Sequence, residues 1–175
     1  MVEIKDNKEI NVIVFDKTLG DIDQLTLVLN RAYKQLAVMG LKYVASHQDS
    51  SITFERIEHA HCLVAMQGEK IVGTISFYPP GNKMVCNWYK KDGVGVIGQF
   101  GVLPELQGSG LGKRLLDEVE LYASKQKEVT EVALDTAEKA DHLIAMYANR
   151  GYEFVEHVDW EQTNYRSVIM SKTIR

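Results

Sequence analysis

The sequence Gln107-Gly108-Ser109-Gly110-Leu111-Gly112 lies between an apolar run, residues 94–103, and a helix-patterned segment that opens at Leu111. Three glycines in a strand-to-helix turn leave backbone N–H groups unobstructed by side chains, and a helix N-terminus adds partial positive charge. The stretch therefore predicts a turn that binds phosphate.

The flanking residues exclude the two commonest nucleotide-binding loops. A Walker A loop requires a glycine five residues before its Gly-Lys pair and a Ser or Thr after it, but Gln107 and Arg114 occupy those positions. Residues 93–98 match the dinucleotide pattern GxGxxG, which must follow a strand and open a helix. Polar residues precede this match and a strand pattern follows it, so we reject it.

Composition places the chain among single-domain globular proteins. Its 175 residues are 45% hydrophobic and 25% charged, and we expect one domain over residues 1–175. The net charge of −4 gives no electrostatic support for nucleic-acid binding. No apolar run approaches the ~20 residues that span a bilayer, so no membrane partner is expected.

Cysteine usage and the first residues indicate the compartment. The chain opens without the basic and apolar regions of a secretory signal, and it contains only Cys62 and Cys86. We expect a cytoplasmic protein with two free thiols.

Hydrophobic periodicity predicts the order β-α-(α)-β-β-β-α-β-α-β-β. Asp21 and Gln24 resemble a pair that caps the first helix, and Gly151 is placed to end the last one. The expected strands cover residues 10–15, 61–67, 71–78, 94–102, 129–135, 152–160 and 166–173, and the helices cover residues 21–39, 51–58, 111–125 and 137–150.

A long connection follows the third strand and ends near Val94. Loops of this length in compact domains are often functional, and this one carries Met84, Trp88 and Tyr89. These side chains either shape the mouth of a substrate site or pin the loop by packing.

Three motifs in order resemble the GNAT superfamily of acyl-CoA-dependent N-acetyltransferases. Residues 107–112 match its (Gln/Arg)-x-x-Gly-x-(Gly/Ala) motif, residues 102–105 resemble the strand end and turn before it, and residues 147–152 resemble its Tyr-x-x-x-Gly-(Phe/Tyr) ending. The element order fits over nearly the whole chain.

The resemblance implies an α/β (α+β) single-domain fold, with a mixed, mostly antiparallel central sheet flanked by about four helices. The sheet would splay between its fourth and fifth strands, residues 96–102 and 129–135, so that the pantetheine arm of coenzyme A lies in the gap. Acetyl-CoA is the implied co-substrate and no metal is implied.

The resemblance also implies which residues hold coenzyme A. Backbone groups of Phe100, Gly101 and Val102 would pair with the pantetheine amides. The pyrophosphate would lie on backbone amides of Gln107, Gly108, Ser109, Gly110, Leu111 and Gly112, with Lys113 adding charge.

Amide formation sets three chemical requirements. An alkylamine with a pKa of about 10.4 must lose a proton before it attacks the thioester. The attacked carbonyl then needs a backbone N–H, expected near Val102. A thiol pKa of about 8.5 and a phenol pKa of about 10 make proton donation by tyrosine nearly balanced, and the resemblance gives this role to Tyr147. Its alternative role is a core tyrosine.

The general base is not evident from the sequence. The strand where many family members carry a carboxylate offers Gln99. By residue type the candidates are Glu105, Asp135, His142 and His157. His59 and His61 would share one face of an extended segment, but without a third ligand nearby they do not predict a metal site.

One position departs from the family. Many members carry an asparagine seven residues before the catalytic tyrosine, and Ala140 stands there. This departure leaves open an acyl group other than acetyl.

The acceptor is expected to be a primary amine of a small molecule or peptide. Tyr33, Tyr43 and Trp88 are candidate substrate-binding residues because their ring faces attract cations. A homodimer through edge strands near the C-terminus is a further expectation. The alternative to an enzyme is a non-catalytic acyl-CoA-binding module with the same fold.

Overall fold

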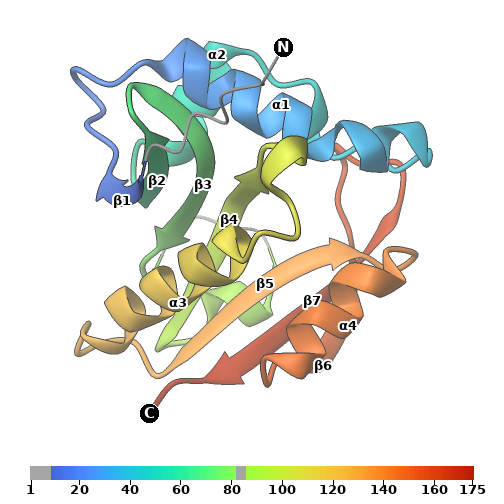
Figure 1. Ribbon diagram of the computed structural model, residues 1–175. Coiled ribbons are helices and arrows are strands. Elements are labelled where there is room, and N and C mark those ends of the chain that lie inside the picture. The colour runs from blue at the N-terminus through green and yellow to red at the C-terminus, as the bar shows by residue number, and fades with distance from the viewer. Residues whose placement is uncertain (1–8, 82–85) are drawn as a thin grey trace.

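A computed structural model describes residues 9–81 and 86–175, which form one seven-stranded sheet with helices on both faces (Figure 1). The strands are β1 (Ile10–Val14), β2 (His61–Gln67), β3 (Lys70–Tyr78), β4 (Val94–Val102), β5 (Glu131–Ala137), β6 (Glu153–Asp159) and β7 (Arg166–Thr173). The helices are α1 (Ile22–Val38), α2 (Ser50–Ile57), α3 (Leu111–Ser124) and α4 (Asp141–Asn149), with 3₁₀ turns at Val44–Ser46, Trp88–Lys90 and Pro104–Leu106. The predicted element order and fold class are confirmed.

The sheet parts between β4 and β5. Its strand order is β1-β2-β3-β4-β5-β7-β6, and every neighbouring pair is antiparallel except β4 and β5. These two parallel strands pair only where Val94, Gly95 and Val96 face residues 131–133. Figure 1 shows them diverging beyond that point. The predicted splay is therefore confirmed.

A β-bulge lies in β4 just after the strands part. Ser76 pairs with Gly98 and Thr74 pairs with Gly101, so Gln99 and Phe100 together face the single residue Ile75. Gln99 adopts a φ of +48°, a left-handed conformation that is uncommon outside glycine. A bulge bends its strand, which turns β4 away from β5.

Helices α3 and α4 cover one face of the sheet, and α1 and α2 cover part of the other. A Cβ on Gly73 would lie 3.1 Å from Leu115 of α3, whereas a Cβ on Gly101 would lie 2.8 Å from Ala32 of α1. Glycine at position 101 is thus required by the close approach of α1 to β4. The largest apolar core lies between the sheet and the α3–α4 layer.

The predicted start of α1 is confirmed, although the paired cap is only half formed. Asp21 accepts a hydrogen bond from Gln24 N at 2.9 Å, as an N-cap residue does. The Gln24 side chain accepts a hydrogen bond from Ile71 N instead of returning to the N-cap. Gln24 therefore attaches α1 to the turn between β2 and β3.

Two predicted boundaries near α4 are wrong by several residues. The expected helix over residues 137–150 begins only at Asp141, because β5 continues to Ala137, which pairs with Ser167 of β7. The expected strand over residues 129–135 correspondingly starts at Glu131. Alanines fit either periodicity, so sequence alone does not place this boundary.

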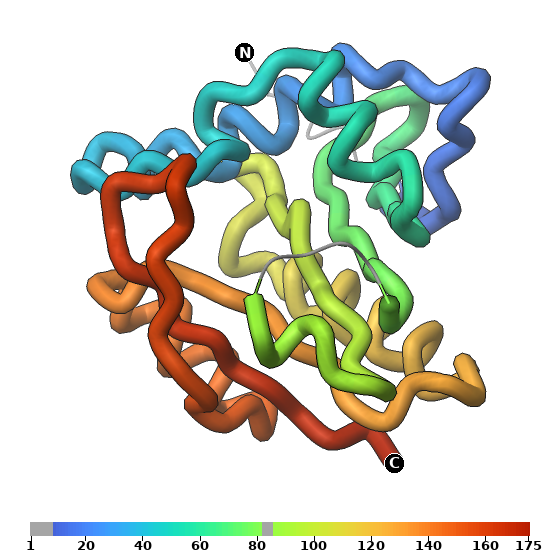
Figure 2. The backbone as a smooth tube through the Cα atoms, turned by 180° about the vertical axis from the view of Figure 1, so that it is seen from behind, coloured from blue at the N-terminus to red at the C-terminus, as the bar shows by residue number. Residues whose placement is uncertain are grey.

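The face opposite α3 and α4 is completed by two irregular segments. Figure 2 shows the stretch around Trp88–Lys90 and the turn between β6 and β7 on this side. Asn164 in that turn accepts from Lys42 N at 2.9 Å and donates to Gly40 O at 2.8 Å, so it is attached to the end of α1. Met84, which sequence reasoning placed in the same loop, lies outside the described residues.

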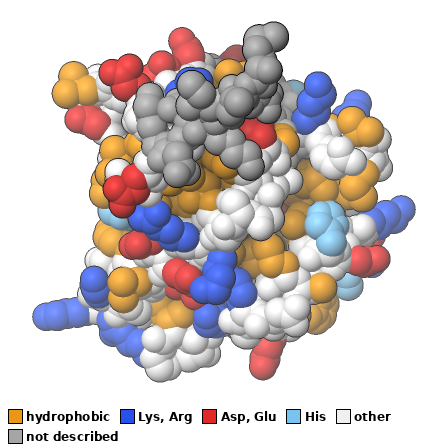
Figure 3. Space-filling view, in the orientation of Figure 1, with side chains coloured by type: hydrophobic (Ala, Val, Ile, Leu, Met, Phe, Trp, Pro, Cys, Tyr) orange, Lys and Arg blue, Asp and Glu red, His pale blue; other side chains and the backbone are white. Residues whose placement is uncertain are grey.

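Figure 3 shows acidic and basic side chains intermingled over the face that carries α3 and α4. Within residues 9–81 and 86–175, no helix is both long and apolar enough to cross a membrane. Cys62 and Cys86 are buried free thiols in different apolar clusters.

Candidate functional site

The end of β4 presents backbone groups to the gap. Leu103 N donates to Val72 O of β3 at 2.9 Å. Because successive residues of a strand turn their N–H groups to opposite sides, the N–H of Val102 points toward the gap beside β5. The Gln107 side chain donates to Val102 O at 3.1 Å, which ties the glycine turn to the strand end.

The glycine turn has an open surface. Gly108 and Gly110 have φ values of +77° and +89°, and a Cβ on either would contact nothing within 4 Å. Leu111 begins α3, so the first amides of that helix have no carbonyl partner within it. A Cβ on Gly112 would lie 3.4 Å from the Phe100 ring, so this glycine lets the helix approach β4.

Lys113 stands at the solvent edge of the turn. Its side chain is 74% exposed and its Nζ lies 2.8 Å from Asp117, one helical turn later. Arg150 also contacts Asp117, at 2.9 Å. Lys113 and Arg150 thus share the carboxylate of Asp117.

A cavity of about 940 Å³ lies on the opposite face of the sheet, where β4 and β5 diverge. Its walls come from the C-terminal half of α1, from α2, from β4 and β5, and from the two irregular segments. Among the lining residues are Tyr33, Tyr43, Arg56, Gln99, Asp135 and Trp160. Two predicted substrate-binding residues, Tyr33 and Tyr43, are thus part of this wall.

Asp135 lines this cavity from β5, one of the two strands that part at the gap. It accepts hydrogen bonds from Tyr89 Oη at 3.0 Å and from Trp160 Nε1 at 3.1 Å. Burial raises the pKa of Asp135, against the opposing effect of these two donors. A carboxylate with a raised pKa is a stronger base than one in water.

Arg56 of α2 is a lining residue that sequence reasoning missed. Its Nη1 donates to the Gln48 amide oxygen at 2.9 Å. With its own amide oxygen turned toward Arg56, Gln99 accepts from the guanidinium at 2.9 to 3.2 Å. The only signal in the sequence was the position of Arg56 on a short helix, and this is too common to single it out.

Three neighbouring tyrosine rings line part of the cavity. The ring of Tyr43 lies 5.1 Å from that of Tyr33 and 4.8 Å from that of Tyr165. The Tyr43 hydroxyl accepts from Ala137 N at 2.8 Å and lies 2.8 Å from Thr136 Oγ1. Burial raises the pKa of Tyr78, another lining residue, to about 12. These phenols are therefore neutral at physiological pH.

Tyr147 lies in α4 within the main core and is 7% exposed. Its ring meets that of Tyr152 edge-on at 5.8 Å. Burial raises the pKa of Tyr147, with further contributions from Tyr33, Tyr43 and Asp135. Tyr147 is not among the residues that line the 940 Å³ cavity.

The remaining candidate bases lie elsewhere. Glu105 pairs with Arg31 at 3.0 Å, His157 lies 3.8 Å from Glu138, and His142 is exposed. None of the three lines the cavity described above. Asp135 is the one candidate base that does.

Trp88 also lies outside the cavity wall. Its indole donates to Glu131 at 2.6 Å, and Lys91 Nζ lies 3.3 Å from the ring centroid. The ring face that could attract a substrate cation is thus occupied by a lysine of the same loop. Tyr89, its neighbour in sequence, lines the cavity instead.

Ala140 is completely buried at the start of α4. It packs in an apolar cluster with Leu36, Leu41 and Tyr43, which fills the space that a larger polar side chain would need. The departure from the family at this position therefore coincides with a closely packed contact between α4 and the end of α1.

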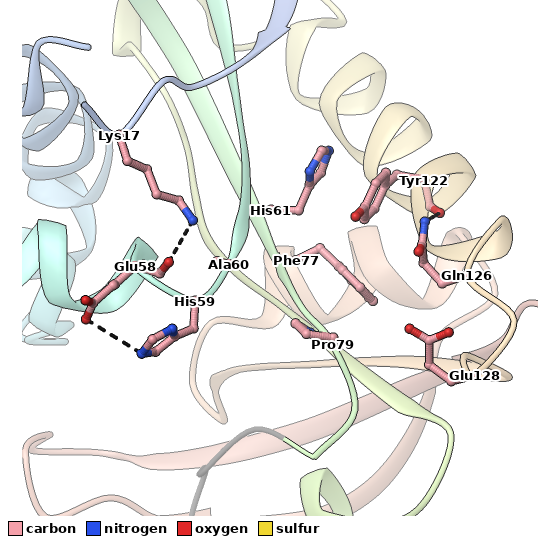
Figure 4. Close-up of a pocket in the computed structure, with 10 residues that line it drawn as sticks. All are labelled: Lys17, Glu58, His59, Ala60, His61, Phe77, Pro79, Tyr122, Gln126 and Glu128. Atoms are coloured by element: carbon pink, nitrogen blue, oxygen red, sulfur yellow. Dashed lines mark hydrogen bonds and ion pairs between the residues drawn. The ribbon is translucent and has the colours of Figure 1, made fainter. Parts of the chain in front are cut away.

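A smaller cavity of about 480 Å³ lies beside the start of β2 (Figure 4). The rings of His61 and Tyr122 stack there at 3.5 Å, and Lys17 donates to Glu58 O at 2.7 Å. His59 turns to the Glu58 carboxylate, 3.7 Å away. The two histidines thus have different partners, and in the described part of the chain no three His, Cys, Asp or Glu side chains are arranged to hold a metal ion.

The fold and the gap at the end of β4 match one enzyme class, the N-acetyltransferases. A profile of the Acetyltransferase (GNAT) family matches residues 29–152, a stretch that includes the glycine turn, Tyr147 and most of the residues that line the cavity. The chain belongs to this family.

Three known proteins illustrate the relationship. The S-(2-succino)cysteine N-acetyltransferase of Bacillus subtilis is 31% identical over 133 residues, which are 75% of this chain and 78% of the relative. The S-alkylcysteine N-acetyltransferase of the same organism is 27% identical over 165 residues, 90% of this chain and 86% of the relative. A putative acetyltransferase from Salmonella typhimurium, solved with its cofactor acetyl-CoA, has a TM-score of 0.70 at 16% identity, covering 95% of each chain.

Proposed function

We propose that this N-acetyltransferase takes its acetyl group from acetyl-CoA and transfers it to the primary amine of a small molecule, by direct attack of the amine on the thioester. The single observation that carries this proposal is the parting of β4 from β5 between two open surfaces. The glycine turn lies at the end of β4, and the 940 Å³ cavity lies on the other face of the sheet.

The glycine turn fits the pyrophosphate of coenzyme A. Cβ atoms on Gly108 and Gly110 would occupy the space into which the turn opens, and both residues need the positive φ that glycine permits. Leu111 N makes a 3.4 Å hydrogen bond to Ser109 Oγ, and the amides that follow it in the first turn of α3 have no carbonyl partner within the helix and can donate to an anion. Phe100, Gly101 and Val102 would hold the pantetheine arm with backbone groups, and acetyl-CoA would supply the acetyl group as a thioester.

The cavity supplies the acceptor side of the reaction. In our proposal Asp135 accepts the proton that an ammonium group must lose before it can attack. Its raised pKa and its place in the wall support this role. The N–H of Val102 donates to the carbonyl oxygen on which negative charge develops.

Tyr147 is proposed as the acid that protonates the leaving thiolate. The raised pKa of Tyr147 keeps its phenol protonated at physiological pH, so the proton is available. Desolvation that raises a phenol pKa raises a thiol pKa as well, so the transfer stays nearly balanced inside the gap.

The names of the two Bacillus relatives indicate an acceptor class. Both are called N-acetyltransferases of S-substituted cysteines. We therefore take S-substituted cysteines as the first amines to test on this chain. A cavity with polar and aromatic walls suits a small amino acid that carries a substituent on sulfur.

A non-catalytic acyl-CoA-binding module is the alternative. It would bind acetyl-CoA and release no thiol with any amine. The experiment first measures the binding of acetyl-CoA by calorimetry, then follows free thiol with a panel of S-substituted cysteines, other amino acids and alkylamines. Turnover with any amine supports the enzyme, whereas tight binding with no thiol release above the rate without protein supports the binding module.

A further inference from the structure

We infer that Arg56 is an anchor for a carboxylate of the acceptor, so that the enzyme selects amines that carry a carboxylate group. This inference rests on the proposed function, because it names the substrate class of the same cavity. It concerns binding and selection, not the transfer step.

The first argument is the charge of Arg56. Its guanidinium lines the cavity, and within the described residues no carboxylate lies close enough to form an ion pair with it. The nearest side chains on the guanidinium are the amides of Gln48 and Gln99, which are uncharged. A partly buried cation with no carboxylate in direct contact favours an anionic ligand.

The second argument is the way in which Arg56 is held. Gln48 and Gln99 are 2% and 5% exposed, so the guanidinium lies on two buried amides. Gln48 is fixed in turn by a 2.8 Å hydrogen bond to Thr53 of the same helix as Arg56. The backbone carbonyl of Arg56 also accepts from Tyr78 Oη at 2.6 Å. A side chain fixed in this way loses little freedom when it binds a ligand.

The third argument is the supply of donors. An arginine and two glutamines offer more N–H groups than oxygen acceptors. In one orientation of the Gln99 amide, Gln48 Nε2 donates to Gln99 Oε1 at 3.0 Å. In the other orientation, the Gln99 oxygen faces Arg56 and accepts from the guanidinium instead. This oxygen therefore serves either Gln48 or Arg56. A carboxylate with two acceptor oxygens would satisfy guanidinium donors that the amides leave unused.

The β4 bulge explains why this arrangement exists. Gln99 occupies the strained left-handed position of the bulge, and this conformation points its side chain to Arg56 on the cavity side. A carboxylate at position 99 would neutralise the guanidinium. The amide at position 99 leaves the charge of Arg56 available to the substrate.

Asp135 completes the selection from the other side of the same cavity. Its charge opposes that of Arg56, and the two side chains do not pair directly with each other. An acceptor with both a carboxylate and an ammonium group meets an opposite charge for each. An amine without a carboxylate gains no attraction from Arg56.

The test compares two acceptors that differ by one group. S-methyl-L-cysteine carries the carboxylate, and 2-(methylthio)ethylamine is the same molecule without it. We expect kcat/KM of the wild-type protein to favour S-methyl-L-cysteine by about 30-fold, and Arg56→Gln to reduce this ratio by roughly 10- to 30-fold, toward one, through KM. Lys34→Gln, which removes an exposed charge from α1, is the matched control and should keep the ratio.

Two further variants separate recognition from folding. Arg56→Lys keeps the charge but loses the planar fork, so part of the preference should remain. Gln99→Glu neutralises the guanidinium and should lower the ratio without any change at Arg56. A wild-type ratio near one, or a ratio that Arg56→Gln leaves unchanged, would overturn the inference.

A binding measurement keeps the inference testable if no amine is acetylated. Calorimetry with 3-(methylthio)propanoate, which has the carboxylate and no amine, should show at least about tenfold weaker binding to Arg56→Gln than to the wild type. Such a loss would support the anchor although the proposed function had failed. Equal binding of 3-(methylthio)propanoate to both proteins, or no binding to the wild type, would overturn the anchor. In the kinetic experiment, thiol release with no preference for the acceptor that carries a carboxylate would also overturn the anchor, but it would support the proposed function.

Discussion

Trp160 donates its indole N–H to the Asp135 carboxylate at 3.1 Å, although 25 residues separate the two in the chain. The turn between β6 and β7 brings the indole to the cavity wall beside β5. This hydrogen bond favours the charged form of a carboxylate whose pKa burial raises. Its removal should therefore be visible in the pH dependence of the reaction.

We predict that Trp160→Phe moves the acidic limb of kcat/KM to higher pH. The proposed base acts when ionised, so activity rises with pH through the raised pKa of Asp135. Loss of one donor to the charged form raises that pKa further, by about one unit. The measurement is kcat/KM against pH with one good acceptor.

Trp88→Phe is the matched control for this change. It removes an indole whose N–H donates to Glu131 outside the cavity wall, so its acidic limb should match that of the wild type. An unmoved limb in Trp160→Phe, or an equal shift in both variants, would contradict the role of Asp135.

Asp135→Asn should lower kcat by about 10²- to 10³-fold, because the amide accepts hydrogen bonds but takes up no proton. Its stability should not fall in parallel. A pKa raised in the folded state means that ionisation of Asp135 costs stability as pH rises through that pKa. The variant lacks this cost, so its Tm at neutral pH should equal or exceed that of the wild type. A variant that is both inactive and much less stable would indicate a structural role.

The element order, the four helices and the splay followed from periodicity and from a family resemblance carried by three motifs. Local signals sufficed to place the start of α1, which Asp21 caps, and the end of α4, which Gly151 follows. They failed at residues 137–140, where pairing with β7 extends β5 against a pattern that also fits a helix. That pairing joins segments distant in sequence, and no local pattern reports it.

The lining of the 940 Å³ cavity was only partly predictable for the same reason. Tyr33 and Tyr43 were expected in its wall, but Arg56 and Trp160 were not. Arg56 gains its position from Gln48 and from the left-handed bulge residue Gln99, whose conformation depends on the register between β3 and β4. Trp88 was expected either to shape a substrate site or to pin its loop by packing, and Lys91 Nζ lies 3.3 Å from its ring centroid.

Tyr147→Phe should lower turnover by about 10- to 100-fold while the dissociation constant of acetyl-CoA changes little, because only the proton is lost and the ring still packs. The measurements are steady-state kcat and calorimetric binding of acetyl-CoA. Tyr152→Phe is the control, since its ring contacts Tyr147 at 5.8 Å while its hydroxyl donates to Glu120. Equal turnover of wild type and Tyr147→Phe would refute the acid, as would an equal loss in Tyr152→Phe.

Gly110→Ala should weaken coenzyme A binding severalfold beyond its effect on stability. Both Gly110 and Gly40 have positive φ, +89° and +85°, and a Cβ on either contacts nothing within 4 Å. Alanine at each position should therefore cost about 1 kcal/mol of stability through the backbone alone. Gly110 precedes α3, where its added Cβ and the altered backbone would disturb the amides proposed to hold pyrophosphate. Gly40 lies after α1, so Gly40→Ala should lose stability and keep its affinity; comparable affinity of the two variants for coenzyme A would place the pyrophosphate elsewhere.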